Sequence, residues 1–150
     1  MRQDFDKEED YLFYLESLTL DQLLADEDEA DSDVLVAIAK KLGRQRKFTD
    51  AEAYFDRAIA IDPENPWVNL FFGNLYFTWG KNDNAITYFK TAISLAPDVA
   101  CPYWCLGDVY ALTLNDTLAA EMYRTAVLVD PDDPQSQQKL KQWEKRNLGR

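Results

Sequence analysis

The sequence predicts an all-α protein: a right-handed superhelical array of three helix pairs, with an N-terminal helical extension and a C-terminal capping helix. Three observations carry this prediction. Proline recurs at a step of 34 residues, at Pro63, Pro97 and Pro131. Alanine and aromatic residues keep the same step, at Ala51, Ala85 and Ala119, at Ala58, Ala92 and Ala126, and at Phe55, Phe89 and Tyr123. A fixed period of this length is typical of stacked helical units that share a continuous core.

A column of small residues predicts where the two helices of each pair cross. Ala39, Gly73 and Gly107 occupy it, and a small side chain lets two helix backbones approach closely. The Ala, aromatic and Ala columns that follow are spaced by four and three residues, so they form one stripe of the second helix. Proline closes each unit because it cannot continue a helix.

Residues 1–33 are expected to form an acidic N-terminal helical extension and a linker. Tyr11-Leu12-Phe13-Tyr14-Leu15 begins a stretch that is too apolar to remain in water without a partner, whereas residues 26–33 carry six acidic side chains and suit a solvated linker. The whole segment holds thirteen acidic and two basic residues, which equals the net charge of −11 of the entire chain. The remaining residues therefore carry no net charge.

Residues 34–150 are expected to form the repeat domain, with repeats at about 32–65, 66–99 and 100–133 and a polar cap helix at 134–147. Gly80 and Asn115 are expected at left-handed positions after helices. Thr49, Asn82 and Asp116 are expected N-caps. The predicted helix pairs are 33–44 with 48–61, 66–79 with 82–95, and 100–113 with 116–129.

Composition excludes several classes of function. The chain has no histidine, which removes Ser-His-Asp and Cys-His nucleophile systems and His-ligated zinc. An acidic chain without a basic stripe is a poor ligand for nucleic acid or anionic lipid. A calcium loop starting at Asp26 fails, because Ala30 and Ala37 occupy ligand positions. We expect no enzyme, cofactor, metal or membrane segment, and two cysteines without a secretory signal favour the cytoplasm.

The repeat pattern resembles the tetratricopeptide repeat. Residues 100–133 carry its Trp-x2-Leu-Gly-x2-Tyr, Ala-x3-Phe and Pro elements, and residues 32–65 and 66–99 repeat them with Leu35 and Asn69 in the Trp column. The resemblance covers about two-thirds of the chain. Its residues in the third repeat are Tyr103, Leu106, Gly107, Tyr110, Ala119, Tyr123 and Pro131.

In such an array the first helix of each pair lines a concave groove that binds extended protein segments. Trp67 and Trp104 lie beyond the core columns, and exposed tryptophan in a concavity marks a binding hot spot. Asn74 and Asp108 are expected to bond the backbone of the ligand. For any one aromatic residue, ordinary core packing is the alternative. The predicted groove residues are Val36, Lys40, Trp67, Leu70, Asn74, Phe77, Cys101, Trp104, Asp108 and Leu112, with Asp33 beside them.

Two groups within this family bear on the ligand. The carboxylate clamp for heat-shock chaperone C-termini needs two Lys, one Arg and two Asn, but the matching positions here are Val36, Lys40, Phe71, Cys101 and Cys105. The chain is more similar to the class II chaperones of type III secretion. The similar segments are residues 18–24 (a Thr-Leu element), 47–51 (Lys-Phe-x-x-Ala) and 102–104 (Pro-Tyr-Trp), although the Gly that usually precedes Thr-Leu is absent.

The resemblance implies a non-catalytic chaperone that holds an extended segment of a secretion substrate in its groove, in the bacterial cytosol. The alternative is a general scaffold or adaptor that assembles another protein complex. The apolar part of residues 5–25 must cover a surface on its own first repeat, in its own groove or on a second copy. The family resemblance favours a second copy, and therefore a homodimer.

Overall fold

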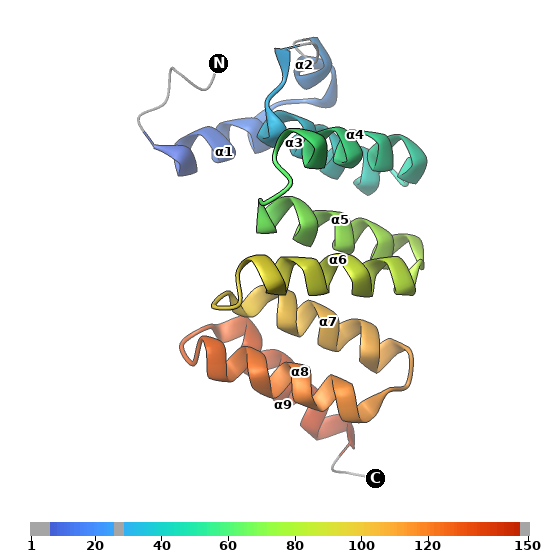
Figure 1. The fold of residues 1–150 in the computed structure, drawn as a ribbon, viewed down its shortest axis with the longest axis vertical. Coiled ribbons are helices and arrows are strands. Elements are labelled where there is room, and N and C mark those ends of the chain that lie inside the picture. The colour runs from blue at the N-terminus through green and yellow to red at the C-terminus, as the bar shows by residue number, and fades with distance from the viewer. Residues whose placement is uncertain (1–6, 26–28, 148–150) are drawn as a thin grey trace. The chain divides into compact units, whose positions relative to one another are not determined.

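The computed structural model describes residues 7–25 and 29–147, and within them every regular element is an α-helix. The predicted all-α class and the repeated helix pairs are therefore confirmed (Figure 1). The helices are α1 (Glu8–Ser17), α2 (Leu20–Ala25), α3 (Ser32–Arg44), α4 (Phe48–Ile61), α5 (Pro66–Trp79), α6 (Asn82–Leu95), α7 (Ala100–Leu112), α8 (Asp116–Val129) and α9 (Pro134–Asn147).

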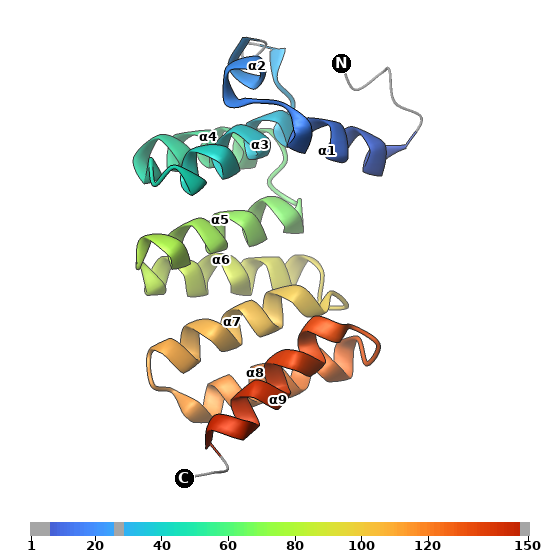
Figure 2. The same ribbon diagram turned by 180° about the vertical axis from the view of Figure 1, so that it is seen from behind.

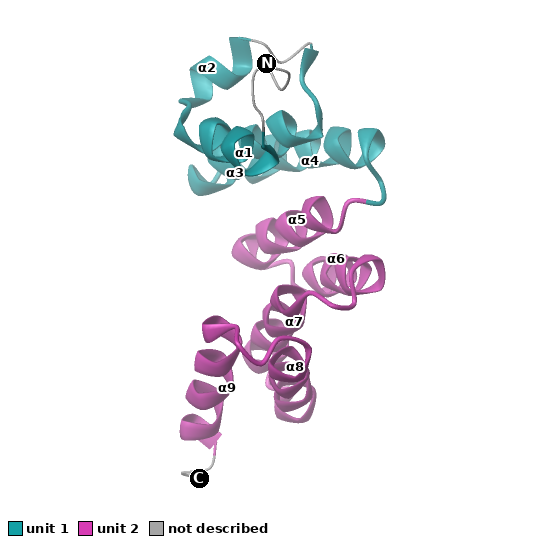
Figure 3. Ribbon diagram, turned by 90° about the vertical axis from the view of Figure 1, so that its left-hand side faces the viewer, with its two compact units in different colours: residues 1–64 teal, residues 65–150 magenta. Residues whose placement is uncertain are grey.

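The chain divides into two compact units between residues 64 and 65, at the boundary of the first and second predicted repeats (Figure 3). Unit 1 holds the pair α3–α4 together with α1 and α2, which both pack on α3. Unit 2 holds the pairs α5–α6 and α7–α8 and the last helix, α9.

The residue columns recognised in the sequence pack between the two helices of each pair. The alanine and aromatic columns of α4, α6 and α8 are buried throughout. A Cβ atom built on Gly73 would lie 2.6 Å from Cε1 of Phe89, and one on Gly107 would lie 2.8 Å from Cε1 of Tyr123. The ring of the second helix therefore fills the space that the glycine leaves, which is the close crossing predicted from the small-residue column.

Helix boundaries agree with the sequence wherever a proline or glycine sets them. Helices α4, α5, α6, α8 and α9 have the predicted bounds, and Gly80 ends α5 at φ 84°. The expectation for Asn115 was wrong, because Leu114 takes the left-handed position at φ 60°. Leu114 lies one 34-residue step after Gly80, so the turn keeps its geometry although the glycine is lost.

The expected N-caps of α4, α6 and α8 were also wrong. Lys47, Lys81 and Asn115 hold these positions. At α4 and α6 the cap is made by the backbone alone, since the carbonyl of Lys47 accepts from Ala51 N at 3.0 Å and that of Lys81 from Ala85 N at 3.1 Å. At α8 the side chain of Asn115 accepts from Leu118 N at 3.3 Å, so Asn115 acts as the N-cap.

The N-terminal extension covers its own first repeat. Tyr11, Leu15 and Leu23 are buried. The Tyr11 hydroxyl donates to Oδ2 of Asp31 at 3.1 Å. Of the three surfaces considered for this segment, α3 of the same chain is the one that α1 and α2 contact. The homodimer stays a prediction, and residues 5 and 6 of its segment lie outside the described residues.

The predicted acidic linker, residues 26–33, extends too far, because its last three residues belong to the start of α3. Residues 31–33 begin α3: Asp31 is the N-cap and accepts from Val34 N at 3.0 Å, and Ser32 is the first helical residue. A carboxylate is well suited to this place because it satisfies a free backbone N–H of the first turn. Residues 26–28, the centre of the linker, lie outside the described residues.

Helix α9 packs on α8 and α7 at the end of unit 2 (Figure 2). Asp133 starts it by accepting from Ser136 N at 2.8 Å, and hydrogen bonds from Ser136 lower the pKa of this carboxyl group. Two later residues depart from the repeat: Lys141 stands in the small-residue column and Glu144 in the column that holds Leu or Tyr elsewhere. This agrees with the polar cap predicted from the sequence.

Candidate protein-binding face

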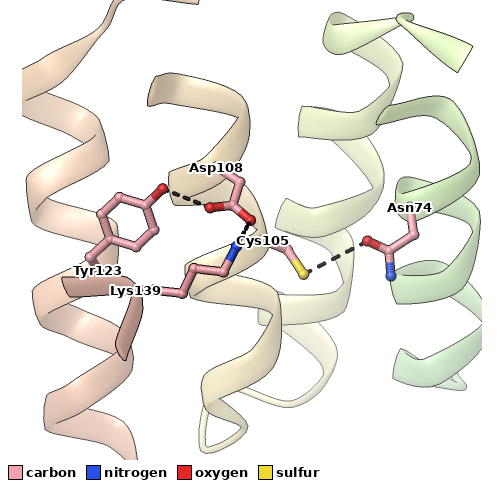
Figure 4. Close-up of polar contacts among 5 residues, drawn as sticks. All are labelled: Asn74, Cys105, Asp108, Tyr123 and Lys139. Carbon is pink, nitrogen blue, oxygen red and sulfur yellow. Dashed lines mark hydrogen bonds and ion pairs between the residues drawn. The ribbon is translucent and has the colours of Figure 1, made fainter. Parts of the chain in front are cut away.

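The candidate site is the side of unit 2 formed by α5, α7 and α9, which we call the first-helix face. Figure 3 shows α5 and α9 on one side of this unit, and α6 and α8 on the other. Side-chain contacts join the three helices (Figure 4): the Cys105 thiol of α7 donates to Oδ1 of Asn74 in α5 at 3.8 Å, and Lys139 of α9 bonds to Asp108 of α7.

Asp108 is the centre of the polar contacts on this face. Its Oδ1 accepts from the Tyr123 hydroxyl at 2.7 Å, and its Oδ2 accepts from the ammonium group of Lys139 (Figure 4). Burial, followed by the bond to Asp108, raises the pKa of Tyr123 well above its ordinary range. Both carboxylate oxygens of Asp108 thus accept hydrogen bonds from the same chain. In this structure the role of Asp108 is therefore to position Lys139.

Lys139 lies against Trp104 as well as Asp108. Its Nζ is 5.2 Å from the centre of the Trp104 ring, a distance at which a cation is attracted to the face of an indole. About a quarter of each charged side chain remains exposed. Asp108 is the only acidic residue predicted for the groove in unit 2, and the ion pair with Lys139 neutralises it. The first-helix face therefore presents Trp104 beside a pair of compensated charges.

Sequence reasoning missed Lys139 and Tyr123. One signal for Lys139 was present, because it lies one 34-residue step after Cys105, a position already matched to the carboxylate clamp. Tyr123 was assigned only to the core column. Its hydroxyl reaches Asp108 because the helices cross closely at Gly107, which is a relationship of packing and not of spacing.

The two cysteines lie on the same helix, α7, with different environments. Cys105 is buried and Cys101 is half-buried, and both are free thiols. The contact between the two thiols lowers the pKa of Cys101. The same contact, with burial, raises the pKa of Cys105 well above its ordinary value. Cys101 is also the more accessible thiol, so we expect it to react before the buried Cys105.

The apolar surface of the face comes from a few of the predicted residues. Trp67 is 48% exposed, and Leu112 is also exposed, whereas Leu70 is buried in the core. Phe77 and Trp104 are partly exposed. Trp67 sits in the first turn of α5, where its backbone N–H donates to the Asn65 side chain at 3.0 Å.

Asn74 keeps one polar group available. Its Oδ1 accepts from Cys105, but no described residue accepts a hydrogen bond from its side-chain Nδ2. The side chain is half-buried, so this donor lies at the surface of the face. An amide N–H at such a position can donate to a backbone carbonyl of a bound segment.

The remaining predicted residues belong to unit 1. Val36 is buried, so its side chain offers no surface to a ligand in this structure. Asp33 is half-buried. Lys40 donates to Oε1 of Glu16 in α1 at 2.7 Å, and the neighbouring Lys41 donates to the Glu16 carbonyl at 3.1 Å. The extension thus contacts Lys40, which corresponds by the 34-residue step to Asn74 and Asp108 of the first-helix face.

Within residues 7–25 and 29–147, no group of three or more acidic or cysteine side chains is placed to hold a metal ion. None of the helices in those ranges has the length and hydropathy needed to cross a bilayer.

The folded units belong to the class of helical-repeat proteins, in which successive helix pairs recur at a constant number of residues. The family model described as TPR repeat matches residues 73–113. The matched segment runs from the second half of α5 through α6 to the end of α7.

Solved structures share this fold. The first TPR domain of Spaghetti, bound to an HSP90 peptide, is similar with a TM-score of 0.68 and 19% identity, over 77% of this chain and 92% of that chain. The Sgt2 TPR domain from Aspergillus fumigatus has a TM-score of 0.70 and 17% identity, over 77% of this chain and 78% of that one. YrrB, a TPR protein with an unusual peptide-binding site, has a TM-score of 0.67 and 22% identity, over 75% of this chain and 58% of that one.

A curated relative is anaphase-promoting complex subunit 6 of Arabidopsis thaliana. It is 28% identical over 89 residues, which are 59% of this chain. The aligned part spans only 16% of the length of that relative.

Proposed function

We propose that this protein is a non-catalytic binding module whose first-helix face holds an extended segment of a partner protein. The observation that carries the proposal is Trp67, a large aromatic side chain that is half exposed on a helix whose other apolar residues are mostly buried. Tryptophan of this kind is a preferred anchor at interfaces. The free thiols fit the cytoplasmic location expected from the sequence.

The side chains of the first-helix face suit a segment that has apolar side chains and a backbone carbonyl free to accept a hydrogen bond. Trp67, Phe77 and Trp104 supply aromatic contact area, and the side-chain amide of Asn74 can donate to a carbonyl of the segment. The charge of Lys139 is compensated by Asp108, so an acidic ligand gains little from it. The HSP90 peptide belongs to the Spaghetti complex, and the positions matched here to the carboxylate clamp hold one basic residue, Lys40, which is paired with Glu16.

The test is a peptide selected from a random library against the intact protein, followed by affinity measurements on variants. Trp67→Ala and Trp104→Ala should each weaken binding by about 1–3 kcal/mol. The matched control is Leu128→Ala, since Leu128 is 79% exposed but lies on α8. Equal affinities for the wild type and both tryptophan variants would contradict the proposal.

A narrower proposal is that the partner is a substrate of type III secretion. The similarity of residues 18–24 to the Thr-Leu element of class II chaperones supports it. In this chain Thr19 and Gln22 form a reciprocal cap: Gln22 N donates to Thr19 Oγ1 at 3.3 Å, and Thr19 N to Gln22 Oε1 at 2.8 Å. Co-expression with a translocator protein should keep that protein soluble, and the Trp67→Ala variant should not.

A second candidate is a scaffold that joins subunits of a complex. The similarity to a subunit of the anaphase-promoting complex favours it, although that match covers a small part of the relative. A scaffold binds a folded subunit as well as an isolated peptide, whereas a chaperone prefers the unfolded chain. Affinity for the same partner in its folded and denatured forms separates the two.

A further inference from the structure

Helix α1 exposes a second apolar surface, separate from the first-helix face. Phe13 is 78% exposed and Leu12 is 43% exposed. The opposite stripe of the helix holds Tyr11 and Leu15, which are buried against unit 1. The helix is thus fixed by one stripe and presents two adjacent apolar side chains to solvent on the other.

Carboxylates surround this apolar pair. On a helix, residues three and four apart are neighbours, so Glu9 lies beside both Leu12 and Phe13 from one side, and Glu16 lies beside both from the other. Both glutamates are exposed. Among the described residues, Lys40 pairs with the Glu16 carboxylate and Lys41 donates to the Glu16 carbonyl, so Glu16 is compensated within the chain, and the charge left for a partner lies at Glu9 and the first turn. The helix opens with three acidic residues and has no basic residue in its last turn.

The charge of the extension decides between possible occupants. A second copy would bring the same excess of eleven negative charges to the interface, which opposes association. The same charge attracts a basic partner and speeds its encounter. A helix is the natural shape for that partner, because the exposed stripe of α1 can receive a ridge of side chains from another helix.

We propose that the Leu12–Phe13 face of α1 is a docking site for a basic amphipathic helix of a partner protein. Apolar residues of the partner pack on Leu12 and Phe13, and its Lys or Arg side chains flank them and reach Glu9 and Asp10 in the acidic first turn, as flanking charges do in coiled coils. The site is built entirely within unit 1.

The probe is a capped synthetic peptide of two Leu/Lys heptads, titrated into the full-length protein by calorimetry. Phe13→Ser should weaken its binding by about tenfold, as expected for an aromatic anchor. Glu9→Gln should weaken it less and should reduce its dependence on salt. Phe13→Gln, which favours the helix more than Ser does, checks that any loss is not due to unwinding of α1.

Two controls identify the surface. Leu128→Ser removes a side chain of equal exposure from α8 and should leave peptide affinity unchanged. Trp67→Ala should also leave it unchanged, so failure of this proposal is distinguishable from failure of the first-helix face. Peptide binding that is indifferent to Phe13→Ser overturns the proposal. So does a full-length dimer, seen by sedimentation, that Phe13→Ser converts to a monomer, because a second copy is then the occupant.

Discussion

The hydroxyl of Tyr123 in α8 donates to Oδ1 of Asp108 in α7 across 2.7 Å, so a core residue of a second helix orients a polar residue of the first-helix face. The Tyr123 ring fills the space over Gly107, and its hydroxyl continues to Asp108, which in turn holds Lys139 of α9. Packing inside the pair and the charge pattern on the face therefore depend on the same side chain.

The first prediction concerns stability at alkaline pH. The pKa of Tyr123 is raised in the folded state, so the unfolded chain loses this proton first, near pH 10. The stabilisation from the neutral hydroxyl is present below that pH and is lost as pH rises above it. Urea unfolding of the wild type should show this loss, and Tyr123→Phe should reduce it. Identical pH profiles for the two proteins would show that another group is responsible.

A second prediction tests the close helix crossing. In Gly73→Ala the new methyl group would lie 2.6 Å from a buried ring atom of Phe89, so the ring must move. Overpacking of about 1–3 kcal/mol should outweigh the gain of about 1 kcal/mol in helix propensity. Thermal unfolding should show a lower midpoint. The control is Lys90→Ala on the exposed side of α6, which should change stability by about 0.5 kcal/mol or less.

A third substitution, at Leu114, is expected to raise the stability of the fold instead of lowering it. Leu114 takes a left-handed conformation, with φ 60°, and its side chain is 86% exposed. Such a conformation costs a residue with a Cβ atom roughly 1–2 kcal/mol, and the exposed side chain regains little by packing. Leu114→Gly should therefore stabilise unit 2, by up to about 1 kcal/mol after the extra entropy of glycine in the unfolded chain is included. A lower denaturant midpoint for this variant would contradict the strain argument.

The cysteines give a chemical prediction. Alkylation under native conditions should modify Cys101 before Cys105, because the pKa of Cys101 is lowered and that of buried Cys105 is raised. Mass spectrometry of digested protein, sampled over time, measures both rates. In denaturant the two rates should become equal, which serves as the control. Preferential modification of Cys105 in the folded protein would contradict the structure.

Much of the fold could be predicted from the sequence because its determinants are local or periodic. Gly80 ends a helix through its own backbone freedom, and a proline after each second helix stops it regardless of the partner it contacts. Leu114 shows the limit of such reasoning. No property of leucine suggests a left-handed residue, and only the turn geometry inherited from the repeat imposes it.

The first-helix face was only partly predictable. Trp67 was singled out because it fits no core column, and the structure leaves it half exposed. Leu70 and Val36 follow the same face pattern but are buried, since their exposure depends on neighbouring helices and not on their own spacing. The bonds of Asp108 join residues 15 and 31 positions apart, and such contacts exist only after the helices have packed.

Helix α9 has a consequence for engineering. A further second helix could not pack on it as α8 packs on α7, because Lys141 would hold the backbones apart at the crossing and Glu144 would place a carboxylate in a column that is otherwise buried Leu or Tyr. A longer version of this protein, with an added repeat to extend the first-helix face, therefore requires a small residue at 141 and Leu or Tyr at 144, for example Lys141→Gly and Glu144→Tyr. Without both changes, an appended helix would remain a tethered peptide instead of becoming part of the folded array.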